Sequence, residues 1–91
     1  MSKKRLMLSL VSPEKTIYEG EINSIALPGS LGAFTILPQH APIVSSLKSG
    51  KITYLTIGGE ETVDIQSGFV EMSGEEVSVC IILKQAYNGN K

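Results

Sequence analysis

The chain has 91 residues, which suffices for one domain built around one thin hydrophobic core. Its 8 basic and 9 acidic residues give a net charge of −1, which excludes the basic surface typical of a nucleic-acid-binding protein. The single cysteine excludes an internal disulfide, and no apolar run approaches the roughly 20 residues that span a bilayer, so we expect a cytosolic protein.

Apolar residues recur at every second position through most of the chain, which is the pattern of β-strands with one buried face. The pattern is clearest at residues 6–10 and 77–83. Clusters of Gly and Pro separate the apolar stretches, and Gly58-Gly59 is a strong hairpin signal. We expect strands at residues 5–11, 16–20, 21–27, 33–37, 42–46, 51–57, 61–67, 68–73 and 76–83.

These nine or so short strands predict an all-β fold, a two-sheet β-sandwich or flattened barrel with negligible helix. We assign residues 1–84 to this domain and residues 85–91 to a short polar tail, with no C-terminal helical hairpin. The apolar phase slips between Ile22 and Ile25 and again between Tyr54 and Leu55. Each slip predicts either a β-bulge or a strand buried on both faces.

The residues that carry chemistry are too few and too scattered to form a catalytic or metal site. His40 is the only histidine and has no Ser, Cys or Asp partner at a motif spacing. The stretch from Gly29 to Gly32 lacks the lysine and the helix of a phosphate-binding loop. Cys80 lies inside an apolar strand, where we expect a buried, inert thiol. We therefore predict a protein that is not an enzyme and holds no cofactor.

The segment from Leu27 to Val44 is rich in Gly and Pro and is nevertheless apolar. Ordinary solvent-exposed loops are more polar than this. We expect Ile36 and Leu37 to point into the core, and Leu31 and Phe34 to point outward as a surface for a partner.

The same segment and its neighbours carry a family resemblance. Five motifs and one single glycine follow one another in a specific order and spacing: Val11-Ser12-Pro13-Glu14, Tyr18-Glu19-Gly20-Glu21-Ile22, Leu27-Pro28-Gly29, then Gly32, then Ile36-Leu37-Pro38 and His40-Ala41-Pro42-Ile43. Together they resemble the N-terminal β-sandwich domain of the epsilon subunit of F-type ATP synthases, over about residues 6–83.

The resemblance implies a sandwich of about ten strands and a non-catalytic rotor subunit of the central stalk. Such a subunit links the gamma subunit to the membrane c-ring and supports the coupling of proton flow to ATP synthesis. The implied partners are therefore gamma and the c-ring, with no nucleic acid and no required homo-oligomer. The implied location is the cytoplasmic face of a bacterial cell membrane, which the chain touches only through the ring.

The resemblance also implies two contact surfaces. The c-ring contact is expected at Ser30, Leu31, Gly32, Ala33 and Phe34. The gamma contact is expected at Ser12, His40, Ala41, Pro42, Ile43 and Ser45. The family often has an acidic or amide residue where this chain has Ala33, so we expect a ring contact without a salt bridge there.

Many members of the family carry a second, two-helix C-terminal domain, whereas we expect this chain to be a naturally short bacterial form. The alternative that the residues leave open is an unrelated β-sandwich protein-binding module. A carbohydrate-binding module is disfavoured because the chain has no Trp and few other aromatic residues.

Overall fold

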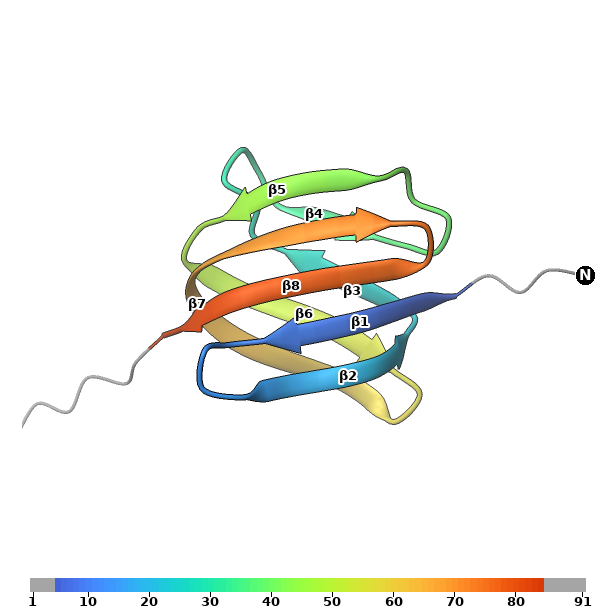
Figure 1. The fold of residues 1–91 in the computed structure, drawn as a ribbon, viewed down its shortest axis with the longest axis horizontal. Helices are drawn as coiled ribbons and strands as arrows, with labels where there is room; N and C mark the ends of the chain where they lie inside the picture. The colour runs from blue at the N-terminus through green and yellow to red at the C-terminus, as the bar shows by residue number, and fades with distance from the viewer. Residues whose placement is uncertain (1–4, 85–91) are drawn as a thin grey trace, which may run out of the picture.

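The computed structural model describes residues 5–84, and all of their regular structure is β-strand (Figure 1). This confirms the predicted all-β class. No helix among the described residues is long and apolar enough to cross a membrane. The tail predicted at residues 85–91 lies outside the described residues. The eight strands are β1 (Leu6–Val11), β2 (Thr16–Ile22), β3 (Ser24–Leu27), β4 (Phe34–Ile36), β5 (Ile43–Leu47), β6 (Gly50–Thr56), β7 (Gly59–Ser73) and β8 (Glu76–Leu83).

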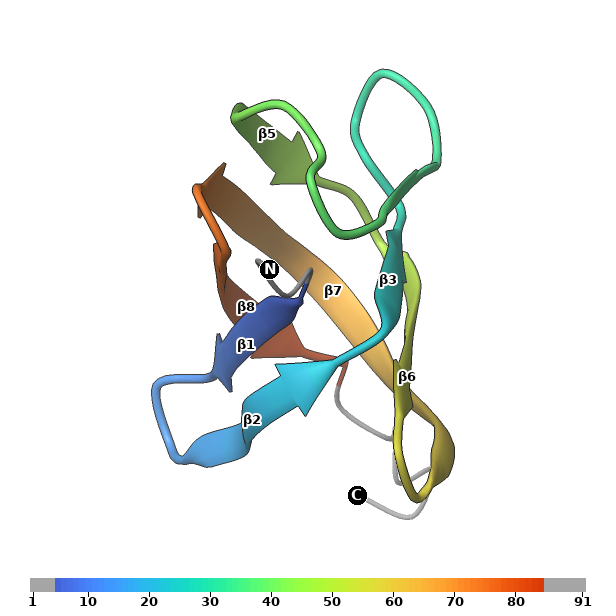
Figure 2. The same ribbon diagram turned by 90° about the vertical axis from the view of Figure 1, so that its right-hand side faces the viewer.

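The strands form two layers that share the 15-residue strand β7 (Figure 2). The first part of β7 pairs with β6, which continues through β3 to β4 in the second layer. The later part of β7 pairs with β5 on one edge and with β8 on the other, and β8 continues through β1 to β2 in the first layer. Only the β1–β8 pair is parallel among the described strands.

Two of the predicted strands, 61–67 and 68–73, form the single strand β7, which corrects the expected count to eight. The register with β8 shifts between Ile65 and Ser67, where β7 passes from one layer to the other. A bulge bends a strand without ending it. Gly68 belongs to the same bend, because an added Cβ there would lie 2.9 Å from the carbonyl oxygen of Cys80.

The two predicted phase slips have different explanations, and neither is a bulge. Ile22 ends β2 in one layer and Ile25 lies on β3 in the other, so both face the shared core. The chain crosses between the layers at Asn23, whose N–H donates to the carbonyl oxygen of Leu55 at 2.7 Å. In β6 the phase does not slip at all, since Tyr54 is buried and Leu55 is exposed.

The core lies between the two layers and is almost entirely aliphatic. Burying one such side chain contributes roughly 1.5–3 kcal/mol, so these residues dominate the stability of the fold. The buried set is Leu6, Leu8, Leu10, Ile22, Ile25, Leu27, Ile36, Leu47, Ile52, Tyr54, Ile65, Val70, Met72, Val77, Val79 and Ile81.

Two residues predicted to be buried are exposed instead. Cys80 alternates with Val79 and Ile81, and because those two face the core, the thiol faces outward. Leu37 follows directly after buried Ile36 and is 55% exposed, because β4 ends at Ile36 and the chain leaves the sheet there.

Candidate functional site

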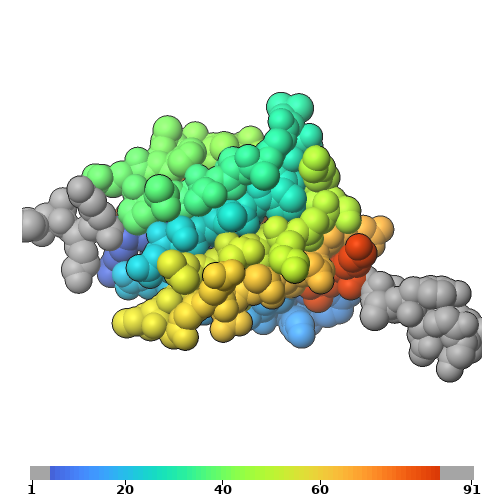
Figure 3. Space-filling view, turned by 180° about the vertical axis from the view of Figure 1, so that it is seen from behind, coloured from blue at the N-terminus to red at the C-terminus, as the bar shows by residue number. Residues whose placement is uncertain are grey.

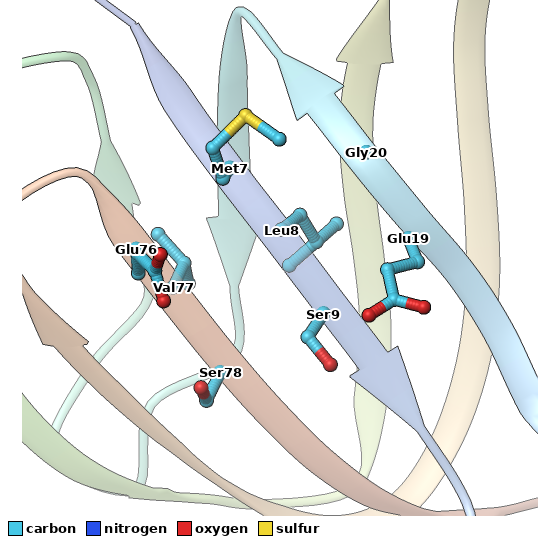
Figure 4. A pocket seen from close by; sticks show the side chains of 8 residues that line it. All are labelled: Met7, Leu8, Ser9, Glu19, Gly20, Glu76, Val77 and Ser78. Atoms are coloured by element: carbon cyan, nitrogen blue, oxygen red, sulfur yellow. The ribbon is translucent and has the colours of Figure 1, made fainter.

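The two hollows described below, both formed by residues within 5–84, contain neither a histidine nor a lysine. Within residues 5–84, no three His, Cys, Asp or Glu side chains gather closely enough to hold a metal ion. A hollow of about 220 Å³ lies across β2, β1 and β8, with Glu19 and Glu76 on its two sides (Figure 4). The residues that line it include serines but no histidine or lysine that would activate them. The features that stand out are surfaces.

The loop between β3 and β4, residues 28–33, projects beyond the ends of the strands. It rises next to β5 in Figure 2 and forms the teal knob at the top of Figure 3. Leu31 has a relative exposure of 104%, so its side chain makes no packing contact within the chain. A fully exposed leucine on a projecting loop is a candidate contact for a partner.

The residues that join this loop to the strands, Pro28, Gly29 and Phe34, are packed against the sandwich, and we call them the foot of the loop. Leu31 at its tip is exposed. Pro28 and Gly29 are buried. A Cβ added to Gly29 would lie 2.6 Å from the carbonyl oxygen of Gly32 and 2.7 Å from Cε1 of Phe34, so only glycine fits there. The N–H of Gly32 donates to the carbonyl oxygen of Gly29 at 3.0 Å, which closes the turn beneath Leu31.

The structure brings the five residues of the predicted ring contact together on this loop and at its foot. Ser30, Leu31, Gly32 and Ala33 are exposed. Phe34 differs from the expectation, because it is half-buried and packs against the core instead of pointing outward. It supports the loop from below. None of the five residues is charged, so the loop offers apolar surface and backbone groups to a partner.

The second predicted set is divided between the connection from β4 to β5 and β5 itself: His40, Ala41, Pro42, Ile43 and Ser45. In the connection, Gln39 has φ 71°, a left-handed conformation that non-glycine residues adopt at a cost of roughly 1–2 kcal/mol. Next to it, the N–H of His40 donates to the carbonyl oxygen of Leu37 at 3.0 Å, and its Nδ1 lies 2.6 Å from the carbonyl oxygen of Ala41. On β5, Ile43 and Ser45 are half-buried and lie on the same side as buried Leu47.

Ser12, the remaining predicted residue, lies apart from this set at the end of β1. It is 8% exposed, and its N–H donates to the carbonyl oxygen of Lys15 at 2.9 Å. Its hydroxyl also lies 3.3 Å from both the nitrogen and the carbonyl oxygen of Lys15. Ser12 therefore shapes the turn between β1 and β2, and β8 and β7 separate it from β5.

An apolar patch that the sequence analysis missed occupies the sheet face between Ser12 and β5. Val11, Cys80 and Phe69 are direct neighbours in register across β1, β8 and β7. With Pro13 and Ile82 they line a shallow hollow of about 410 Å³ that contains no charged residue. Phe69 is 45% exposed. We call the five residues Val11, Pro13, Phe69, Cys80 and Ile82 the apolar patch.

A signal for the apolar patch is present in the sequence. In β8 the outward positions Cys80 and Ile82 are apolar, although Ser78 on the same face is polar. A strand of this kind has two apolar faces, and alternation alone does not tell which one a partner covers. The patch depends on residues 11, 69 and 80 becoming neighbours, which only strand pairing decides.

Comparisons with known sequences agree with this arrangement of surfaces on a sandwich. Residues 5–86 match the family model described as "ATP synthase, Delta/Epsilon chain, beta-sandwich domain". An ATP synthase epsilon chain of Leptospira interrogans is 39% identical over 79 residues, covering 87% of this chain and 62% of the relative. An ATP synthase epsilon chain of Chlorobaculum tepidum is 43% identical over 76 residues, covering 82% of this chain and 86% of the relative. The chain thus spans less than two thirds of the Leptospira protein.

Two solved structures share the fold. A chain of the Euglena gracilis mitochondrial ATP synthase, in an assembly described as OSCP/F1/c-ring, superposes with a TM-score of 0.81 at 19% identity, covering 90% of this chain and 53% of that one. A chain of the Tetrahymena thermophila mitochondrial ATP synthase central stalk and c-ring superposes with a TM-score of 0.72 at 12% identity, covering 90% of this chain and 66% of that one. At these identities the likeness concerns the fold alone.

Proposed function

Because this chain belongs to the family of the ATP synthase delta/epsilon chain β-sandwich domain, we propose that it is a non-catalytic central-stalk subunit of a proton-translocating F-type ATP synthase. It links the gamma subunit to the c-ring at the cytoplasmic face of a bacterial cell membrane and supports the coupling of proton flow to ATP synthesis. The match over residues 5–86 disfavours the alternative of an unrelated binding module.

The observation that carries this proposal is the 28–33 loop. It presents a fully exposed leucine on a foot of buried residues, which is an arrangement that places one apolar side chain at a defined position. An interaction made by Leu31 and backbone groups does not need a charged partner. We therefore assign Ser30, Leu31, Gly32 and Ala33 to the c-ring contact, with Phe34 as their support.

The sandwich body suits the transmission of torque. Strand β7 runs through both layers, so a load on one layer passes to the other along a covalent chain. The core between the layers is close-packed aliphatic side chains, which have low compressibility. A body of this kind moves as one piece between two partners.

We assign the gamma contact to the apolar patch and to the predicted residues, which extend from Ser12 beside the patch to the edge of this layer at β5. Ser12 lines the same hollow as the patch, and His40, Ala41, Pro42, Ile43 and Ser45 lead into and along β5 at the other edge of this layer. An uncharged hollow rimmed by polar residues has the composition of an interface core. The partner that suits it is an apolar surface of gamma.

The test of the proposal replaces Leu31 by Asp in the assembled enzyme. Burial of a leucine contributes roughly 1.5–3 kcal/mol, and a buried unpaired carboxylate adds a further penalty, so the ring contact weakens strongly. We expect ATP-driven proton pumping in membrane vesicles to fall to less than about half at an unchanged rate of ATP hydrolysis.

The matched control is Ile57→Asp. Ile57 is 103% exposed at the tip of the hairpin between β6 and β7, at the far end of β6 from the 28–33 loop. The Ile57→Asp substitution introduces the same charge at an equally exposed position, and we expect the enzyme that carries it to pump protons normally. Both variants should melt within a few degrees of the parent chain. Normal pumping by the Leu31→Asp enzyme would remove the ring contact from this loop.

A further inference from the structure

The position of Leu31 depends entirely on the backbone below it. Its side chain is fully exposed, so packing against the rest of residues 5–84 does not limit its movement. A contact that transmits torque loses precision if the loop can swing. The groups that hold the loop against the sandwich therefore decide how faithfully Leu31 is placed.

On one side the loop is held by packing against the second layer. The Phe34 ring lies under Gly29, and a Cβ added to Gly50 at the start of β6 would lie 2.9 Å from Cβ of Pro28. These contacts fix the foot of the loop relative to β4 and β6. They do not reach the first layer, which carries the apolar patch.

On the other side the loop is held by hydrogen bonds to β5 in the first layer and to Lys48, the residue that follows it. The N–H of Ser30 donates to the carbonyl oxygen of Ser46 at 3.0 Å, and the N–H of Lys48 donates to the carbonyl oxygen of Pro28 at 2.9 Å. One bond in this group joins two side chains: the hydroxyl of Ser46 donates to the hydroxyl of Ser30 at 2.8 Å. It is the bond that a side-chain substitution can remove while the backbone bonds remain.

Ser46 also borders the apolar patch. It is the direct neighbour of Phe69 in the β5–β7 register, and Phe69 pairs with Cys80, which pairs with Val11. Paired side chains on one face of a sheet lie roughly 4.5–5.5 Å apart. A single row of four residues therefore runs from Val11 on β1 across β8 and β7 to Ser46 on β5, and the Ser46 hydroxyl continues it to Ser30.

We propose that Ser46 is a positioning residue that locks the 28–33 loop to β5 and so couples the two contact surfaces of this subunit. This inference rests on the proposed function, because it assumes that the loop meets the c-ring and the patch meets gamma. Few contacts connect the two surfaces. The Ser30–Ser46 bond joins the loop to β5, and a ladder of five residue pairs joins β5 to β7.

The first test measures amide hydrogen exchange in the full 91-residue chain. In the Ser46→Ala variant, which lacks the hydroxyl–hydroxyl bond, the amide hydrogens of Ser30 and Gly32 should exchange about 2–10 times faster than in the parent chain. This is the range expected for the loss of one hydrogen bond. Ser46→Thr keeps a hydroxyl and should restore slow exchange. Ser78→Ala removes a serine from the outer face of β8 that makes no side-chain hydrogen bond within residues 5–84, and it should leave the loop unchanged.

The second test measures coupling in membrane vesicles that contain the assembled enzyme. The Ser46→Ala enzyme should pump fewer protons per ATP hydrolysed as the opposing proton gradient rises, while its hydrolysis rate without a gradient stays normal. Ser46→Thr should regain the parent ratio, which a purely steric role for the residue would not produce. A Ser30→Ala, Ser46→Ala double variant should be no worse than either single variant, because both remove the same bond.

The outcomes separate this inference from the proposed function. If Ser46→Ala leaves the exchange of Ser30 and Gly32 unchanged, the lock does not exist. If Leu31→Asp uncouples the enzyme and Ser46→Ala does not, the proposed function stands and the lock is overturned. If Leu31→Asp has no effect on coupling, the proposed ring contact fails and the coupling role of Ser46 fails with it.

Discussion

Tyr54 is the one buried residue of the core that can ionise. It lies on β6, and its ring centroid is 5.1 Å from that of Tyr18 on β2, with the rings tilted by 46°. This pair joins strands of the two layers at the side of the sandwich where they are not hydrogen-bonded to each other. Burial first, and then the nearby Glu61 and Tyr18, raise the pKa of Tyr54 above its ordinary value of 10.0.

The raised pKa predicts loss of stability in alkali. The folded chain holds the phenolic proton more tightly than the unfolded chain does, so this stabilisation is complete below pH 10.0 and is lost as the pH rises through the raised pKa. The free energy of unfolding, measured by urea titration between about pH 8 and pH 11, should fall less steeply above pH 10 in Tyr54→Phe than in the parent. Parallel curves would contradict this assignment.

At the scale of elements, the 28–33 loop and the β6–β7 hairpin use glycine for different reasons. Gly29 lies against the Phe34 ring and the backbone of Gly32, where no side chain fits. Gly58 lies in an open turn, where an added Cβ meets only the hydroxyl of Thr56 at 3.6 Å. That hydroxyl accepts a hydrogen bond from the N–H of Gly58 at 3.1 Å and already fixes the turn.

Alanine substitution should therefore separate the two glycines. Gly29→Ala forces the turn and the aromatic ring apart and should lower the free energy of unfolding by roughly 1–3 kcal/mol, as overpacking does. Gly58→Ala should change it by less than about 0.5 kcal/mol. Urea unfolding of the two variants measures both values. Equal effects would mean that the foot of the loop adapts easily and does not hold Leu31 in place.

At the scale of the whole molecule, the two proposed contact surfaces lie on different parts of the sandwich. The 28–33 loop projects from one end, whereas the apolar patch covers part of the outer face of the first layer. Strand β7 connects the layers, with Phe69 on the outer face of one and Thr62 exposed on the other. Substitutions at the two surfaces should therefore have separate consequences.

We expect Phe69→Asp to weaken retention of gamma while leaving binding of detergent-solubilised c-ring intact, and Leu31→Asp to do the reverse. Large aromatic side chains often contribute strongly to the affinity of an interface, and Phe69 is one of them. Its loss should lower the affinity for gamma tenfold or more, which corresponds to about 1.4 kcal/mol or above. Thr62→Asp places the same charge on the opposite face and should affect neither. Loss of both partners in either variant would indicate one continuous interface.

The sequence by itself determined the strands, the class of fold and the exposure of Leu31. Strand periodicity and turn residues are local properties, so alternation at residues 6–10 and 77–83 was sufficient to predict both strands. The position of Leu31 between two glycines also predicted a projecting tip, because a tight turn leaves its central side chain outside the sheets. The motif order sufficed to indicate the family.

Tertiary structure alone decided which apolar residues meet. Alternation separates the two faces of a strand but does not rank them when both are apolar, which is why Cys80 was wrongly placed inside. Whether β7 stops or bends at Ser67 depends on partners far away in the sequence. The apolar patch brings Val11 beside Cys80, 69 positions away, and the Ser30–Ser46 bond joins residues 16 positions apart. Such neighbours arise only from strand order and register, which the hydrophobic burial of the whole sandwich selects.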